Sequence, residues 1–154
     1  MSLRAYREIN LHVTWHVKDN GPVLTDAIQT QTHRFLRARA FDTPGVVFHA
    51  VGGTDDHLHL AVSIPPTLLI SEWVGKLKRG SSHFINHEIA NKAVLQWQAG
   101  YGVVAFGSKD LPWVADYVRD QRRHHAEGRL FERLERTDPL EEPADQGPPP
   151  DEAR

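Results

Sequence analysis

The stretch TDDHLHLAVSIPP, residues 54–66, joins a short polar turn to an apolar run that ends at two prolines. The segment GVVFHAVGG (45–53) before the turn and the segment HLHLAVSI (57–64) after it are rich in apolar and β-branched residues, which predicts two strands. Because only a few polar residues separate them, we expect a tight antiparallel hairpin. The double proline at 65–66 cannot continue a sheet, so it ends the second strand.

Two further strands and three helices complete the predicted domain. Apolar and β-branched residues predict strands over 9–17 and 100–107. Apolar residues at helical spacing predict helices over 24–41, 68–90 and 108–128. The resulting order, βαββαβα, predicts an α+β fold in which the helices pack on one face of an antiparallel sheet.

The composition indicates one globular domain followed by an acidic tail. The 154 residues include no cysteine, which excludes disulfides, thiolate metal sites and a cysteine nucleophile. Residues 137–154 hold six acids, one arginine and several prolines, so we expect a disordered tail after a folded domain over 1–136. Removing them from the chain's 20 acidic and 18 basic residues leaves 14 and 17, a net charge of +3 that permits a polyanionic partner.

The chain shows no sign of membrane insertion or export. No apolar run approaches the ~20 residues of a membrane-spanning helix. The N-terminal sequence MSLRAYREIN lacks the apolar core of a secretory signal. We therefore expect a cytoplasmic protein with no membrane partner.

Two histidines in the strand at 57–64 form a candidate metal site. Side chains at i and i+2 leave a strand on the same face, so His57 and His59 project together with their Cα atoms ~7 Å apart. Two imidazoles at this separation can bind one cation. Two solvated histidines on an open sheet face would give the same pattern, and with ten histidines in the chain an HxH sequence arises easily by chance.

The predicted last helix carries two residues that could complete such a site. Tyr117 and Gln121 are four residues apart, hence neighbours on one helical face. The amide oxygen of Gln121 could be a third metal ligand, and the phenol of Tyr117 a nucleophile. Taken alone, a YxxxQ pair is more simply a helix surface with a half-buried tyrosine.

Other motifs give weaker signals. His83 and His87 have i, i+4 spacing but lack the glutamate of the HExxH protease motif, so we interpret them as a solvated helix face. For His12 and His16, which share a strand face, we expect a structural role. The sequence contains no P-loop, GxGxxG or GxSxG motif, which excludes the common nucleotide-binding sites and the nucleophile elbow of serine hydrolases.

Four blocks of sequence together give a resemblance: DDHLHLAVSIPP, VGKLKRGSSHFIN, WQAGYGVVAF and YVRDQRRHH. They resemble the IS200/IS605-type transposases, the single-tyrosine HUH nucleases, which include the REP-associated tyrosine transposases. HUH denotes histidine, a bulky hydrophobic residue and histidine, here His57, Leu58 and His59. The blocks follow the family's order and spacing over roughly residues 5–127. The resemblance implies a ferredoxin-like HUH fold.

The resemblance also implies a chemistry. Tyr117 would be the nucleophile that cleaves single-stranded DNA through a 5′-phosphotyrosine intermediate. His57, His59 and Gln121 would hold a divalent metal, Mg²⁺ or Mn²⁺, and Asp56 would orient an imidazole from behind. The donor types alone do not choose the metal, since imidazole suits softer ions and an amide oxygen harder ones.

The implied partners are DNA hairpins and a second copy of the chain. Lys76, Lys78 and Arg79 fall in the block that lies near DNA in this family. Family members act as homodimers in which the tyrosine helix of one subunit completes the histidine site of the other, in trans. Glycines on both sides of the apolar VVAF segment (103–106) would give that helix freedom to swing out.

Our interpretation is therefore a DNA transposase, a metal-dependent enzyme that cleaves and rejoins single-stranded DNA at hairpins. Two alternatives remain open from the sequence. One is a domesticated module that binds hairpins without cleavage. The other is a histidine-metal hydrolase of a small substrate, in which Tyr117 is structural. A covalent protein–DNA adduct would distinguish the first interpretation from both.

Overall fold

The computed structural model describes residues 5–137. One sheet holds the strands β1 (Asn10–His16), β2 (Val47–Gly53), β3 (His57–Ser63) and β4 (Gly102–Phe106). The helices are α1 (Asp26–Asp42), α2 (Ile70–Phe84), α3 (Leu111–Arg119), α4 (Gln121–Glu127) and α5 (Glu132–Glu135). Shorter turns are η1 (Lys18–Asn20), the π-helical η2 (Ile85–Ile89) and η3 (Ser108–Asp110). The acidic tail predicted over 137–154 lies, after Thr137, outside the described residues.

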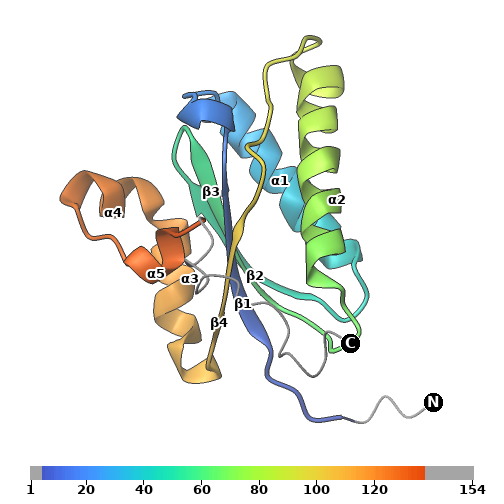
Figure 1. Cartoon of the computed structure of the whole chain (residues 1–154), viewed down its shortest axis with the longest axis vertical. Coiled ribbons are helices and arrows are strands. Elements are labelled where there is room, and N and C mark those ends of the chain that lie inside the picture. The colour runs from blue at the N-terminus through green and yellow to red at the C-terminus, as the bar shows by residue number, and fades with distance from the viewer. Residues whose placement is uncertain (1–4, 138–154) are drawn as a thin grey trace, which may run out of the picture.

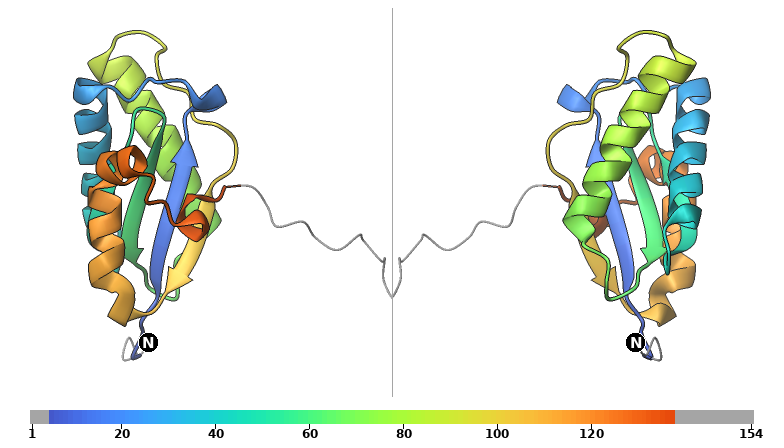
Figure 2. Two further views of the ribbon diagram at one scale, coloured as in Figure 1. Left: turned by 90° about the vertical axis from the view of Figure 1, so that its left-hand side faces the viewer. Right: turned by 90° about the vertical axis from the view of Figure 1, so that its right-hand side faces the viewer.

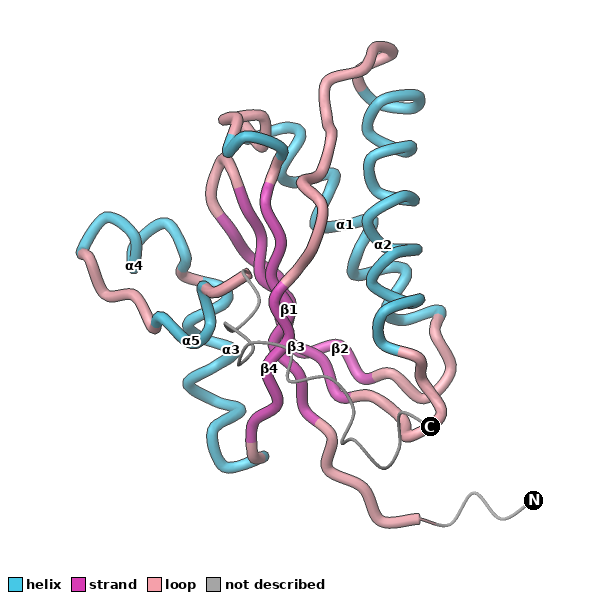
Figure 3. Tube along the Cα trace, viewed as in Figure 1, coloured by secondary structure: helices cyan, strands magenta, loops and turns pink. Residues whose placement is uncertain are grey.

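The sheet is antiparallel throughout, with the strand order β2-β3-β1-β4. The predicted hairpin is confirmed: β2 pairs with β3, and the Thr54–Asp56 turn joins them. β3 in turn pairs with β1, so these two strands are central and β2 and β4 are the edges. Figure 2 shows the strands side by side, and Figure 3 shows the long loop from α2 returning to β4.

The main core lies between the sheet and the helices α1 and α2. Alternate residues of the central strands point to this face, among them Val13, Trp15, Leu58 and Leu60, all fully buried. Figure 1 shows α1 and α2 together on this side of the sheet. Burial of these large apolar side chains accounts for most of the stability of the fold.

The helices cover both faces of the sheet, whereas the sequence predicted helices on one face. Ala50 and Ala61 form an apolar patch on the second face, and Val114 and Val118 of α3 pack on it. Figures 1 and 2 show α3, α4 and α5 on the side of the sheet opposite α1 and α2. The α+β class and the antiparallel sheet are confirmed. Within residues 5–137, no helix is long and apolar enough to cross a membrane.

Gly52 sets the distance between α3 and the sheet. A Cβ atom at Gly52 would lie 1.8 Å from the carbonyl oxygen of Val118, which is far closer than any non-bonded contact allows. Only glycine therefore permits the backbone of α3 to lie directly on β2. Because Val118 follows Tyr117, this contact fixes the height of the tyrosine above the sheet.

Candidate active site

The second face of the sheet carries a row of polar side chains from the two central strands. His12, Thr14 and His16 of β1 lie on it beside His57 and His59 of β3. The predicted pair is almost fully buried, with 3% of His57 and none of His59 exposed, and their ring centroids lie 5.0 Å apart. Their i, i+2 spacing on β3 therefore brings the two imidazoles together under α3.

Each imidazole of the pair is held through its Nδ1 atom. His59 Nδ1 lies 2.7 Å from Nε2 of the buried His12. His57 Nδ1 lies 2.6 Å from Asp56 Oδ1 and 2.9 Å from Thr54 Oγ1. Such partners behind an imidazole fix its tautomer and orientation. Both rings consequently present Nε2 to the same space.

The single helix predicted over 108–128 is divided in the structure: Ser108–Asp110 forms the 3-10 turn η3, and the rest is two α-helices. Helix α3 ends at Arg119 and α4 begins at Gln121, because Asp120 departs from helical geometry with φ −101° and ψ 32°. Tyr117 and Gln121 remain neighbours, since Gln121 Nε2 donates a hydrogen bond to the Tyr117 carbonyl at 2.8 Å. Gly128 ends α4 in the left-handed conformation.

Tyr117 lies directly above the histidine pair. Its ring stands edge-on to His59, with centroids 6.0 Å apart, and only 1% of the residue is exposed. The hydroxyl donates a hydrogen bond to Glu135 and accepts one from the Phe131 N–H at 3.1 Å. Burial, followed by the Glu135 contact, raises the pKa of Tyr117 well above its usual range.

Two residues of the cluster were missed by the sequence analysis. Glu135 Oε2 lies 3.2 Å from His59 Nε2 and 3.5 Å from His57 Nε2. His125 Nε2 lies 3.1 Å from His57 Nε2 and 3.1 Å from Gln121 Oε1. The i, i+4 spacing of Gln121 and His125 could have indicated His125. Glu135 lies beyond the end of α4 at Gly128, and no local sequence pattern links it to the histidines.

The arrangement is suited to a divalent cation. One ligand atom each from His57, His59, His125 and Glu135 lies within 4.8 Å of the others. The buried Nε2 of His59 has Glu135 Oε2 as its neighbour at 3.2 Å, so an imidazole nitrogen and a carboxylate oxygen face the same point. Imidazole nitrogens with one carboxylate oxygen match the donors that first-row divalent metals accept. The predicted ligand Gln121 contacts one member of this group, since its Oε1 lies 3.1 Å from His125 Nε2.

Burial and the contacts between the histidines and Glu135 set the pKa of each group in the cluster. Burial lowers the pKa of His59 to about 4, which keeps its imidazole neutral. Burial disfavours the charged form of His57, but hydrogen bonds with Glu135 and Asp56 outweigh it and raise the pKa of His57. Burial likewise opposes ionisation of Glu135, but the contacts with His57 and His59 hold the pKa of that carboxyl well below its usual range. The carboxylate is therefore ionised.

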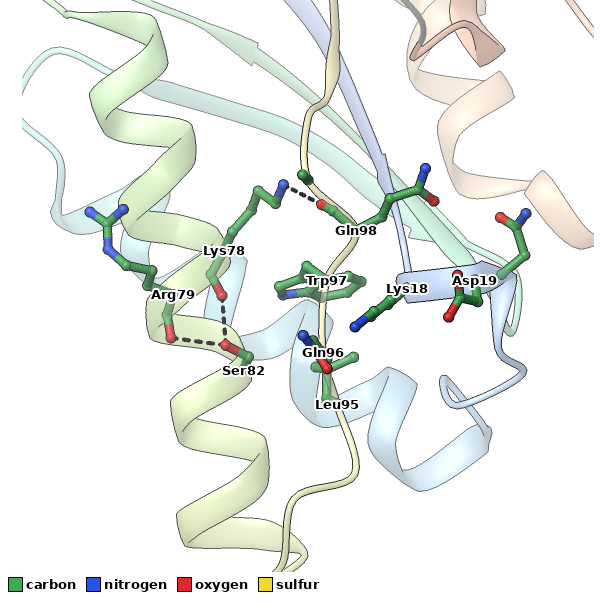
Figure 4. Close-up of a pocket in the computed structure, with 11 residues that line it drawn as sticks. Lys18, Asp19, Lys78, Arg79, Ser82, Leu95, Gln96, Trp97 and Gln98 are labelled. Carbon is green, nitrogen blue, oxygen red and sulfur yellow. Dashed lines mark hydrogen bonds between the residues drawn. The ribbon is translucent and has the colours of Figure 1, made fainter.

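The three predicted DNA-binding residues lie on α2, and their surroundings differ. Lys76 is exposed and forms an ion pair with Glu72 at 3.1 Å. Lys78 Nζ donates hydrogen bonds of 2.7 Å to the carbonyls of Gln98 and Gly100. Arg79 is exposed. Lys78 thus ties the loop before β4 to α2, and Arg79 keeps its charge at the surface (Figure 4).

Comparison with known proteins defines the class. The family model for IS200-like transposases matches residues 5–121, which includes the histidine pair, Tyr117 and Gln121. The chain belongs to the IS200-like transposase family. No curated protein matches the chain significantly.

Two solved structures share the fold. A candidate transposase of Deinococcus radiodurans R1 is 21% identical, with a TM-score of 0.60, and the match covers 79% of this chain and 97% of that one. A REP-associated tyrosine transposase bound to a REP hairpin is 19% identical, with a TM-score of 0.57 and coverage of 81% and 74%. This chain therefore has the fold of these transposases, as the resemblance implied.

Proposed function

We propose that this protein cleaves and rejoins single-stranded DNA in a metal-dependent reaction with Tyr117 as the nucleophile. The observation that carries this proposal is the position of the Tyr117 hydroxyl, one hydrogen bond from a carboxylate that itself lies against both His57 and His59. A nucleophile, a proton acceptor and a metal-ligating pair thus occupy one buried site.

The metal would be held by the Nε2 atoms of His57 and His59 together with an oxygen donor. One candidate donor is the Glu135 carboxylate, which lies 3.2 Å from His59 Nε2. The other is the amide oxygen of Gln121, which lies 3.1 Å from His125 Nε2. When bound, the cation would neutralise charge that develops on the scissile phosphate. The family resemblance favours Mg²⁺ or Mn²⁺, and the nitrogen-rich donor set favours Mn²⁺ of the two.

The residues of the chain account for the proton and the bond changes. The Tyr117 oxygen attacks the phosphorus and forms a phosphotyrosine, while the bond from phosphorus to the 3′ oxygen breaks. The phenol proton passes to Glu135, the carboxylate that already accepts its hydrogen bond, as the Tyr117 oxygen bonds to phosphorus. The departing 3′ oxygen takes a proton from water and becomes a 3′-hydroxyl. Attack by another 3′-hydroxyl reverses these steps and rejoins the strand.

Access to Tyr117 requires a local movement. With 1% of the residue exposed, a phosphate cannot reach the hydroxyl in this conformation. Phe131 covers the tyrosine ring at a centroid distance of 5.0 Å and is itself 48% exposed. It immediately precedes α5, so displacement of its side chain would open a path to Tyr117.

The proposed DNA substrate carries a hairpin, since the similar REP-associated transposase was solved with a REP hairpin bound. We further propose a homodimer in which α3 is exchanged between subunits. In the single chain, α3 packs on its own sheet and places Tyr117 over its own histidines. An exchanged helix would make the same contacts on the partner, because a copy presents the same surface.

The test is covalent capture. Incubating the protein with Mn²⁺ and single-stranded hairpins from the DNA that flanks its gene should yield a protein–DNA adduct that survives denaturation. A protein that binds these hairpins without any adduct would instead be a binding module. Failure to bind DNA, with hydrolysis of small phosphoesters, would favour the histidine-metal hydrolase.

A further inference from the structure

His12 is a buried histidine that the proposed reaction does not use. It lies on β1 diagonally across from His59, since the strand register sets His12 opposite Ala61 and Thr14 opposite His59. Diagonal side chains can touch across a sheet, and His12 Nε2 lies 2.7 Å from His59 Nδ1, with the ring centroids 4.8 Å apart. Neither residue is exposed. The contact therefore joins two imidazoles in the interior of the fold.

The two candidate metal ligands of β3 differ in the group behind them. His57 Nδ1 faces the Asp56 carboxylate at 2.6 Å, and an ionised carboxylate can only accept a hydrogen bond. The proton of His57 on that side is therefore fixed on Nδ1. His59 Nδ1 faces an imidazole instead, and an imidazole donates from one nitrogen and accepts at the other. This hydrogen bond fixes the tautomer of His59 only together with that of His12.

One proton lies between His12 Nε2 and His59 Nδ1, which gives the pair two arrangements. Full burial disfavours an extra proton on either ring, so each ring carries one N–H. If His12 donates, His59 carries its own proton on Nε2, where Glu135 Oε2 can accept it at 3.2 Å. If His59 donates, its Nε2 has a free lone pair, and the proton of His12 is on Nδ1.

The far nitrogen of His12 leaves both arrangements open. Among the described residues, His12 Nδ1 meets no hydrogen-bond partner, so it can hold either a lone pair or a proton. The Glu135 carboxylate favours the first arrangement, because it accepts the Nε2–H of His59. A cation at His59 Nε2 requires the second, because an imidazole binds a metal through a lone pair. The two arrangements thus correspond to the metal-free and the metal-bound protein.

From these contacts we propose that His12 is a positioning residue for metal binding, through a change of tautomer that it shares with His59. When a cation binds, His59 loses its Nε2 proton to solvent and gains the proton between the rings, while His12 takes up one proton on Nδ1. The pair holds two protons before and after. His12 then accepts the Nδ1–H of His59, which the cation makes a stronger donor. The proposal rests on the proposed function, because it takes His59 as a metal ligand.

The change of tautomer can be observed directly by NMR. In the unmodified full chain with isotope-labelled histidine, long-range proton–nitrogen spectra show which ring nitrogen carries a hydrogen. Zn²⁺ alone is the probe, since it is diamagnetic and binds imidazole. We expect His12 and His59 both to change from Nε2–H to Nδ1–H as Zn²⁺ is added. His49, which contacts Ser63 Oγ and lies outside the cluster, should keep its tautomer.

Substitutions of His12 test whether its hydrogen bond sets the metal affinity. His12→Leu removes the acceptor, so the dissociation constant for Zn²⁺, measured by competition with a chelator, should rise by about 10- to 100-fold. His12→Gln keeps an oxygen that can accept the Nδ1–H of His59, and it should recover most of that loss. His49→Leu is the matched control, because it removes an imidazole from the same sheet outside the cluster, and it should leave the affinity unchanged.

A tautomer of His12 that stays the same while Zn²⁺ binds would overturn the proposal, and this result does not depend on whether His12→Leu folds. Equal losses of affinity in His12→Leu and His12→Gln, or in His12→Leu and His49→Leu, would also overturn it. Adduct formation by the unmodified chain on hairpin DNA is measured in parallel. Zn²⁺ binding and an adduct without the change of tautomer refute the role of His12 alone, whereas absence of both refutes the proposed function.

Discussion

The Tyr117 hydroxyl donates its hydrogen bond to Glu135, a residue 18 positions further along the chain. The same carboxylate lies 3.2 Å from His59 Nε2, so one side chain connects the candidate nucleophile to the candidate metal ligands. Glu135 comes from α5, which is only four residues long. The proposed chemistry therefore depends on a short element near the end of the described chain.

Replacing Glu135 with glutamine tests its role as the proton acceptor. Glu135→Gln keeps the shape but removes the negative charge, and we expect the cleavage rate to fall by about 10² to 10⁴. Glu132→Gln is the matched control, because Glu132 is exposed in the same helix and outside the cluster. Single-turnover cleavage with Mn²⁺ measures both. Faster cleavage by Glu135→Gln would show that the carboxylate blocks the phosphate position instead.

The histidine pair and Gln121 should differ in their response to added metal. His57→Ala or His59→Ala removes a buried imidazole, and we expect an activity loss that excess Mn²⁺ does not fully restore. Gln121→Ala removes a neutral amide oxygen, a weaker ligand, so raising the metal concentration should recover part of the activity. Cleavage measured across a Mn²⁺ titration checks this. If all three variants show the same insensitivity to Mn²⁺, these residues do not form a metal site.

Gly52→Ala should damage catalysis without touching any reacting group. The added Cβ would meet the Val118 carbonyl at 1.8 Å, so α3 must rise from the sheet and carry Tyr117 with it. We expect a stability loss of about 1–3 kcal/mol and a cleavage rate at least tenfold lower, with hairpin affinity nearly unchanged. Gly107→Ala is the control, because open space surrounds that position. Normal cleavage by Gly52→Ala would show that the height of α3 is not critical.

Mixing inactive subunits tests the exchange of α3. In a trans dimer, combining His57→Ala and Tyr117→Phe chains creates one site with both defects and one intact site, so cleavage should return. In a cis arrangement every site keeps one defect and the mixture stays inactive. Light scattering establishes whether a dimer forms, and a tag on one variant shows that subunits have exchanged. A monomer, or an inactive mixture after exchange, would refute trans assembly and leave the tyrosine chemistry intact.

The sequence predicted the sheet well because the strands carry strong local signals. The Thr54–Asp56 turn between two β-rich runs predicted the hairpin, and i, i+2 spacing predicted that His57 and His59 share a face. The covering of the second face was not predicted, because Ala50 and Ala61 form an apolar patch only after β2 and β3 pair. Such a patch has no periodicity in either strand alone.

The site was only partly predictable for a similar reason. Asp56 was predicted to orient an imidazole, and its Oδ1 lies 2.6 Å from Nδ1 of the neighbouring His57. His12 and Glu135 reach His59 from sequence separations of 47 and 76 residues, through the β1–β3 register and the return of the chain after Gly128. Contacts of that range follow from tertiary packing, which no single segment encodes.

The most direct measurement for the central claim is the identity of the residue joined to DNA. Unmodified protein incubated with Mn²⁺ and a single-stranded hairpin substrate should form an adduct, and mass spectrometry of its peptides should place a 5′-phosphate on Tyr117. Tyr117→Phe should bind the hairpin with nearly the same affinity and form no adduct. An adduct on another residue, or cleavage by Tyr117→Phe at the normal rate, would contradict the account.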